Sequence, residues 1–368
     1  MSTADSPVEV TGAPVEVAWF GALCDDDYEF LGVPNQTLVS SWEHCADIVA
    51  AADRHGFDNV LLPSGYTLGI DSTAFAAAIA THTSRINLLL AVRMGETWLP
   101  QLARQLATID QFCGGRLTIN IISSDIPGET LASAPRYQRT REWMQVLRML
   151  LDREPIDFHG EFVDLQLEPA RIGTVSGRCP PFYFGGFSPD AKAVAAEHAD
   201  VFLTWPDTVD SVAATVAEMN TLAAGHHRTL ACGLRAHVIV RETEADARAA
   251  AERLVSRLND DVGAEIRAKS LDSASVGVQR QAELRRAAAD DGYVEENLWT
   301  GVGRARSGAG AAIVGDPDQV LAKLGAYQRA GVSAFILSGY PHRQECDLFA
   351  RYVLPHIEHA PLMPRARE

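Results

Sequence analysis

Arg235 and His237 are the two residues of this sequence best placed to do chemistry. They lie two residues apart in the apolar run 230–240, so both side chains project from one face of a strand. An arginine presents a planar set of donors to a sulfonate, phosphate or carboxylate, and a histidine can donate a hydrogen bond or carry a proton near neutral pH. Two polar groups that face one way in an apolar strand need partners. The pair therefore predicts a site for an anionic ligand.

Three more candidates follow other apolar runs. Tyr340 and His342 come directly after the run 334–339, in SGYPH, and Trp205 ends the run 201–205. A tyrosine hydroxyl can donate to a developing oxyanion, and a tryptophan face can wall off a ring or an alkyl chain. Each also has a structural interpretation: Trp205 as core packing, Tyr340 as a loop-shaping residue and His237 as a satisfied buried histidine.

Arg306 lies in the glycine-rich stretch GVGRARSGAG, which ends a long segment, residues 259–310, with no regular pattern. A segment of this length is usually a lid or a disordered loop. Glycines would let it move and bring an arginine to a ligand. We predict a lid-like insertion, with a structural excursion packed on the outside as the alternative.

A phosphate-binding turn is indicated by FGGFSPD, residues 184–190, which follows a strand and opens a helix. Gly185 and Gly186 permit close backbone approach, and Ser188 with the helix amides could bind a phosphate. The alternative is an ordinary turn. Ser123, in the run NIISSD that ends another strand, could border a cofactor ring or only cap a loop.

These residues need a scaffold, and the chain alternates short apolar runs with longer helical patterns. The predicted strands cover residues 15–23, 59–64, 86–93, 116–123, 182–186, 201–205, 230–240 and 334–339. The predicted helices cover residues 42–55, 72–83, 99–112, 136–152, 189–198, 210–224, 243–258, 317–330 and 344–356. Eight strand–helix units with nearly continuous apolar strands favour a parallel sheet closed into a (β/α)8 TIM barrel. An open doubly wound sheet is the alternative.

In such a barrel the site lies at the carboxyl ends of the strands, so the candidates should converge there. Arg235 and His237 would fall in mid-strand if the strand ran to residue 240, so we expect it to reach the rim earlier. Residues 156–167 predict a separate hairpin, because two alternating runs flank a His-Gly pair.

Composition limits the function. The chain has 368 residues and a formal net charge of −16, with no Lys/Arg cluster, which argues against nucleic-acid binding. No apolar run is long enough to span a membrane, and residues 1–14 predict a flexible tail without a secretion signal. We expect one cytoplasmic domain over residues 15–360. None of the six cysteines has metal-ligand spacing, so no metal site is predicted.

Several motifs together resemble the alkanesulfonate monooxygenases of the bacterial luciferase-like superfamily. They are TWPD at 204–207, LRAHVIVRET at 234–243, ENLWTGVGRARSGAGAAIVGD at 296–316 and ILSGYPH at 336–342. The resemblance implies that reduced FMN, supplied by a separate NAD(P)H-dependent FMN reductase, activates O2. The carbon bearing the sulfonate is then oxygenated, which releases sulfite and an aldehyde. It also implies a homodimer or homotetramer.

The matching motifs imply residue roles as well. Trp205, Arg235, His237, Arg306 and Tyr340 fall where the family handles substrate and oxygen, with Arg306 as the lid arginine. The residues implied to lie near the FMN phosphate are Arg136, Tyr137, Gly186 and Ser188.

The N-terminal loops depart from the family. Its Thr-His-Gly-Asp loop after the first strand is replaced by residues 23–29, and residues 64–71 lack its active-site cysteine and arginine, with Leu68 near the cysteine's place. Its Thr-Gly after the fourth strand is Ser123-Ser124 here, and Ser133 replaces a histidine. The motifs that carry the predicted anion-binding residues are retained, whereas the loops that would surround the rest of the substrate are changed. We therefore hypothesise a substrate with a similar polar head but a different body, such as a sulfosugar.

Three alternatives remain open at this point. One is a luciferase-like monooxygenase acting on a non-sulfonate substrate by Baeyer–Villiger oxidation, hydroxylation or N-oxygenation. Another is a deazaflavin-dependent dehydrogenase on the same fold. The third is a non-catalytic flavin-binding barrel, which the polar residues at the rim and the long lid disfavour.

Overall fold

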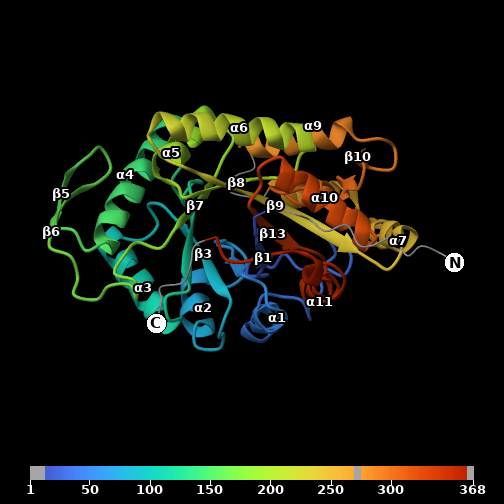
Figure 1. Cartoon of the computed structure of the whole chain (residues 1–368), viewed down its shortest axis with the longest axis horizontal. Helices are drawn as coiled ribbons and strands as arrows, with labels where there is room; N and C mark the ends of the chain where they lie inside the picture. Colours follow the sequence, from blue (N-terminus) through green and yellow to red (C-terminus); the bar gives the residue numbers. More distant parts are fainter. Residues whose placement is uncertain (1–12, 269–274, 363–368) are drawn as a thin grey trace.

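Eight parallel strands form a closed barrel in the computed structural model, which describes residues 13–268 and 275–362. Each strand pairs with the next, and the last pairs with the first, which confirms the predicted TIM barrel (Figure 1). The barrel strands are β1 (Glu16–Phe20), β2 (Asn59–Leu62), β3 (Asn87–Arg93), β4 (Leu117–Ile122), β7 (Phe182–Gly185), β8 (Val201–Thr204), β9 (Ala231–Val240) and β13 (Ala334–Ser338). Most of the predicted tail lies outside the described residues.

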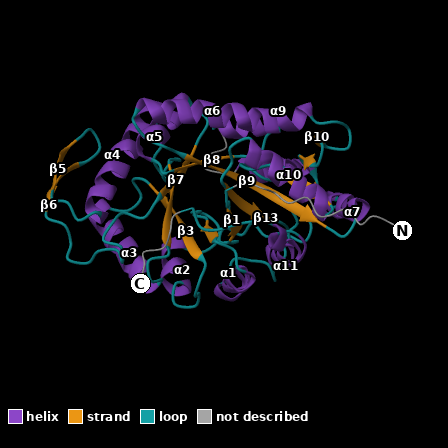
Figure 2. Cartoon of the chain, viewed as in Figure 1, coloured by secondary structure: helices purple, strands orange, loops and turns teal. Residues whose placement is uncertain are grey.

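Helices surround the barrel (Figure 2). They are α1 (Trp42–His55), α2 (Ser72–Ile79), α3 (Leu99–Phe112), α4 (Ser133–Leu151), α5 (Pro189–His198), α6 (Val209–Gly225), α7 (Glu244–Val255), α10 (Pro317–Arg329) and α11 (His342–Tyr352), with a 3-10 turn η2 (Leu354–His356). Local signals set their ends: the Ser41 side chain caps α1, and Gly56 ends it with a φ of 86°. Helix α4 begins three residues before the predicted start.

Alternation along the strands divides the core in two. In β1, Ala18 and Phe20 point into the barrel, whereas Val17 and Trp19 pack against the helices. A buried polar pair fills the amino-terminal part of the barrel interior. There the Tyr183 hydroxyl donates a hydrogen bond to the Glu16 carboxylate at 2.8 Å. Both side chains are fully buried. The site therefore forms at the other end, where the strands end in polar residues.

The segment after α7 has its own structure. It contains α8 (Asp260–Ala268), α9 (Val276–Ala287), β10 (Tyr293–Glu295), β11 (Leu298–Trp299) and a 3-10 turn η1 (Gly301–Arg304), and β12 (Ala312–Gly315) follows it. Strand β12 runs parallel to the outer part of β9, from His237 to Val240. Strand β9 therefore reaches the barrel rim before its end at Val240, as expected from the positions of Arg235 and His237. The strand continues past the barrel rim because β12 satisfies its backbone hydrogen bonds there.

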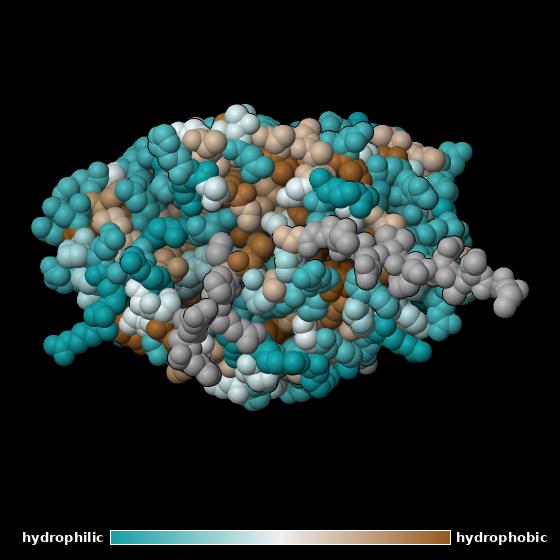
Figure 3. All heavy atoms as spheres, viewed as in Figure 1, coloured by the Kyte–Doolittle hydropathy of each residue, from teal (hydrophilic) through white to brown (hydrophobic). Residues whose placement is uncertain are grey.

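Strands β5 (Ile156–His159) and β6 (Asp164–Leu167) form the predicted antiparallel hairpin, which projects beside α4 (Figure 1). Hydrophilic side chains cover most of the face shown in Figure 3, and hydrophobic ones gather in small areas near its middle. No helix in the described ranges is long and apolar enough to cross a membrane.

Candidate active site

Arg235 and His237 lie at the barrel rim although β9 continues beyond them. The neighbouring β8 ends at Thr204, which pairs with Leu234, and β13 ends at Ser338, which pairs with His237. Both side chains share a face of β9 and are almost completely buried. The predicted pair is thus present, at the level where the neighbouring strands stop.

Arg235 is a buried cation without a carboxylate partner. Its Nη2 donates to Ser338 Oγ at 2.8 Å, and its Nη1 donates to the Ala236 carbonyl at 2.6 Å. Its guanidinium lies 4.4 Å from the centre of the Phe20 ring. Of the described residues, none offers Arg235 an ion pair. Burial, reinforced by the positive charge of Arg306, lowers the pKa of Arg235 to about 9. An uncompensated positive charge at this place stabilises a bound anion.

His237 is linked to Arg235 through Ser338. Ser338 Oγ lies 2.8 Å from His237 Nδ1. Because a guanidinium can only donate, Ser338 accepts from Arg235 and can give its own proton to Nδ1. The imidazole proton then lies on Nε2, which is buried and makes no well-formed hydrogen bond within the described chain. Burial and the charge of Arg235 hold the pKa of His237 well below 6.5, so the ring is neutral near pH 7.

Tyr340 and Arg306 meet beside this pair. The Tyr340 ring stacks on His237 with centroids 5.1 Å apart. Arg306 Nη1 donates to the Tyr340 hydroxyl at 3.0 Å and to Asp26 Oδ2 at 2.6 Å. Burial raises the pKa of Tyr340 above its usual range, so the phenol keeps its proton. Burial alone would lower the pKa of Arg306, but its interactions with the Tyr340 hydroxyl and the Asp26 carboxylate more than offset this effect.

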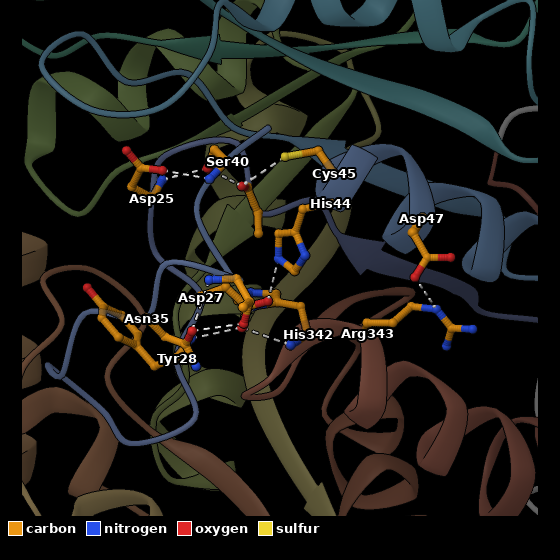
Figure 4. Close-up of polar contacts among 12 residues, drawn as sticks. Asp25, Asp27, Tyr28, Asn35, Ser40, His44, Cys45, Asp47, His342 and Arg343 are labelled. Atoms are coloured by element: carbon orange, nitrogen blue, oxygen red, sulfur yellow. Dashed lines mark hydrogen bonds and ion pairs between the residues drawn. The ribbon is translucent and has the colours of Figure 1, made fainter. Parts of the chain in front are cut away.

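His342 lies behind Tyr340 and is fully buried. Its backbone N–H donates to Asp27 Oδ1 at 3.0 Å, and its Nδ1 lies 2.9 Å from the same oxygen. The second oxygen of Asp27 lies 2.9 Å from His44 Nε2, so the carboxylate sits between two histidines (Figure 4). Burial alone would raise the pKa of Asp27, but His342 and His44 hold it below its usual range. This arrangement fixes His342 against the Phe20 ring, 5.5 Å away.

Trp205 packs where the insertion meets the barrel. Its ring lies 5.8 Å from that of Phe187, and a Cβ at Gly277 of α9 would come within 2.7 Å of it. Helix α9 therefore approaches Trp205 closely only because it has glycine there. A cavity of about 350 Å³ lies between α8, α9 and the loop of Arg306, and Arg267 and Arg285 also line it.

The predicted cofactor residues form a second cluster. Ser188 caps α5 by accepting from the Ala191 N–H. A Cβ at Gly186 would lie 2.5 Å from Ala191 Cβ and 3.4 Å from the Tyr137 hydroxyl, so glycine keeps this turn open. Arg136 Nη1 lies 3.3 Å from Asp125, while its Nε is buried and has no hydrogen-bond partner among the described residues. The amino terminus of α5, a phenol and an arginine fit a phosphate group.

Two further predicted residues lie at the ends of strands beside this cluster. Gly185 ends β7, and a Cβ there would lie 2.6 Å from the Leu203 carbonyl. Ser123 follows β4, and its hydroxyl lies 2.6 Å from that of Thr140 on α4.

Sequence reasoning missed Ser338, Phe20, Asp26 and Asp27. The signal for Ser338 was its position at the end of a barrel strand, two residues before Tyr340. The two aspartates belong to the run Asp25–Asp27 after the first strand, within the loop 23–29 that departs from the family pattern. No metal cluster of three or more His, Cys, Asp or Glu side chains occurs in the part of the chain that the structure describes.

The barrel with polar rim residues defines the class of protein. Residues 29–334 match the family model described as luciferase-like monooxygenase, and the chain belongs to this family. This match confirms the predicted assignment to the luciferase-like superfamily, and the protein is a flavin-dependent monooxygenase.

Two relatives match almost the whole chain. The chain is 65% identical over 354 residues to a sulfoquinovose monooxygenase of Novosphingobium aromaticivorans, covering 94% of this chain and 98% of the relative. It is 50% identical to a sulfoquinovose monooxygenase of Agrobacterium fabrum, covering 95% and 92%. A riboflavin lyase solved with modified FMN and riboflavin superposes with a TM-score of 0.78 at 15% identity, covering 96% and 95% of the two chains, which supports the fold alone.

Proposed function

We propose that this monooxygenase oxygenates the sulfonate-bearing carbon of an organosulfonate, with a sulfosugar such as sulfoquinovose as the substrate. The products are sulfite and an aldehyde. The observation that carries this proposal is Arg235, a buried cation with no carboxylate partner among the described residues. Such a charge is costly unless an anion binds it. The names of the two close relatives support the sulfosugar in particular.

The cofactor we propose is reduced FMN. Its phosphate would be held by the amino terminus of α5 with Gly186, Arg136 and Tyr137, whose geometry fits that group. When bound, the reduced flavin supplies two electrons and activates O2, of which one oxygen enters the aldehyde and the other leaves as water. The family implies a separate NAD(P)H-dependent FMN reductase, and an assembly of two or four copies.

The rim residues then have separate tasks. Arg235 binds the sulfonate. Ser338 fixes the positions of Arg235 and His237 relative to each other, because its hydroxyl is hydrogen-bonded to both. The proton on His237 Nε2 makes no hydrogen bond of good geometry within the described chain, although the Ala309 backbone lies close to the ring, so it can be donated to substrate or oxygen. The Tyr340 phenol is a second donor, and Arg306 is kept against it.

Three other features shape the pocket. Trp205 forms a wall, and His342 supports Tyr340 from behind at a ring distance of 4.9 Å. The insertion at residues 259–310 acts as the lid that excludes water, because it places Arg306 beside the buried donors.

Sulfite release tests the proposal. Purified protein, enzymatically reduced FMN, air and a panel of sulfonates including sulfoquinovose should give sulfite with at least one sulfonate, and glucose should give none. Absence of sulfite from the entire panel would overturn the proposal. If flavin oxidation then still depended on an organic compound, a non-sulfonate substrate would be favoured, as the changed loops at 23–29 and 64–71 allow.

A further inference from the structure

We propose that Asp26 sets the charge of the head group that this site accepts, so that a monoanionic sulfonate is favoured over a dianionic phosphate on a similar body. The inference rests on the proposed function, because it assumes that an anion binds beside Arg235. It assigns Asp26 as a specificity-determining residue.

Only one carboxylate of the Asp25–Asp27 run faces the arginines. Asp25 accepts from the Ser40 backbone N–H at 2.6 Å and from the Gly69 backbone N–H at 3.1 Å. Asp27 lies between His44 and His342 (Figure 4). Asp26 alone turns to Arg306, at 2.6 Å.

The charges beside the Phe20 ring can be counted. The guanidinium groups of Arg235 and Arg306 lie 4.4 Å and 5.4 Å from its centre. Asp26 contributes the opposing negative charge, and it acts on both arginines. His237 is neutral and Tyr340 keeps its proton, so Arg235, Arg306 and Asp26 together carry one net positive charge. His342, which also lies against Phe20, is paired with the buried carboxylate of Asp27 and is not part of this sum.

One net positive charge matches a sulfonate, which has a single negative charge. A phosphate monoester carries a charge of about −1.5 to −2 at pH 7. In a buried site its second charge would remain uncompensated and would be repelled by Asp26. The second oxygen of Asp26 is buried without a hydrogen-bond partner in the described ranges, so few other groups weaken this repulsion.

The test compares two ligands that differ in charge rather than in shape. Glucose 6-sulfate and glucose 6-phosphate share the sugar and a tetrahedral head, and their dissociation constants can be measured by titration calorimetry on flavin-free protein. The wild type should bind the sulfate more tightly. In Asp26→Asn the ratio should shift toward the phosphate by roughly tenfold or more. Glu29→Gln, which makes the same charge change at an exposed position of the same loop, should keep the wild-type ratio.

A second variant, Arg306→Gln, keeps the proposal testable if Asp26→Asn does not fold. Arg306→Gln lowers the local charge, so it should weaken both ligands and shift the ratio toward the sulfate. The proposal is overturned if neither variant changes the ratio, or if Asp26→Asn weakens both ligands equally, since Asp26 would then only position Arg306. It is also overturned if the wild type binds sulfoquinovose but neither ester, or both esters equally.

The two failures can be told apart. Wild-type protein that releases sulfite, together with variants that keep its binding ratio, refutes only the role of Asp26. Wild-type protein that releases no sulfite from any sulfonate and binds no sugar acid refutes the proposed function and this inference together.

Discussion

Replacing Arg235 by methionine should weaken substrate binding strongly while changing the free energy of unfolding little. Arg235 has no carboxylate partner in the described part of the chain, and burial lowers its pKa from 12.5 to about 9. At about 1.4 kcal/mol for each pKa unit, this drop corresponds to an electrostatic cost of about 5 kcal/mol in the free enzyme. Methionine removes that cost and fills a similar volume.

Two losses oppose this gain. Arg235 donates to Ser338 and to the Ala236 carbonyl, and hydrogen bonds to a charged group contribute about 1.5–3 kcal/mol each. The net change in the free energy of unfolding should therefore be within about 2 kcal/mol of zero. Sulfonate binding should nevertheless weaken by roughly a hundredfold or more, because the anion loses its charged partner.

A second arginine provides the control. Arg241 forms a two-pronged ion pair with Glu345, at 2.7 Å and 3.0 Å, and Glu345 is only 2% exposed. Arg241→Met leaves that buried carboxylate without its charged partner and should destabilise the protein by about 3–5 kcal/mol.

Thermal unfolding of the flavin-free proteins and calorimetric titration with sulfoquinovose measure both quantities. The reasoning is refuted if Arg235→Met unfolds as early as Arg241→Met, which would make Arg235 a structural residue. It is equally refuted if Arg235→Met keeps wild-type affinity for the sulfonate.

Four other predictions follow from the site and the barrel. His237→Ala should lower turnover far more than it weakens flavin binding, as stopped-flow turnover and flavin titration would show; unchanged turnover removes His237 from the mechanism. Ser338→Ala should lower kcat/KM for sulfite release by roughly ten- to a hundredfold, since Arg235 loses an acceptor and His237 a donor; wild-type kcat/KM would contradict its positioning role. Arg306→Ala should raise the fraction of flavin oxidation that ends as hydrogen peroxide, because an open lid admits water; intact coupling argues against a lid. Burial raises the pKa of Glu16 from 4.5 to about 7, so its contribution to stability is complete below pH 4.5 and is lost as the pH rises through 7. Glu16→Gln should therefore gain stability relative to the wild type by up to about 3 kcal/mol between pH 5 and pH 8, measured by urea unfolding; a pH-independent difference would show that Glu16 ionises normally.

Local patterns in the sequence were sufficient for the barrel and for part of the site. Each barrel strand is a short apolar run between turn residues, and such runs report burial directly. Period-two alternation placed Arg235 and His237 on one face without any tertiary information. The turn before α5 was predictable for the same reason, because glycines and a capping serine act within a few residues.

The tertiary structure decided how these residues are paired. Three consecutive aspartates are equivalent in the sequence, yet one meets Arg306, 280 residues away, while its neighbours meet histidines and backbone amides. The closure of the barrel brings Ser338 against Arg235 and His237, and β12 extends β9 past the rim. Such contacts depend on the closure of the sheet and the path of the loops, which no local pattern encodes. The sequence therefore determined that Arg235, His237 and Tyr340 stand at the rim, and the fold determined which residues meet them and which charges remain uncompensated there.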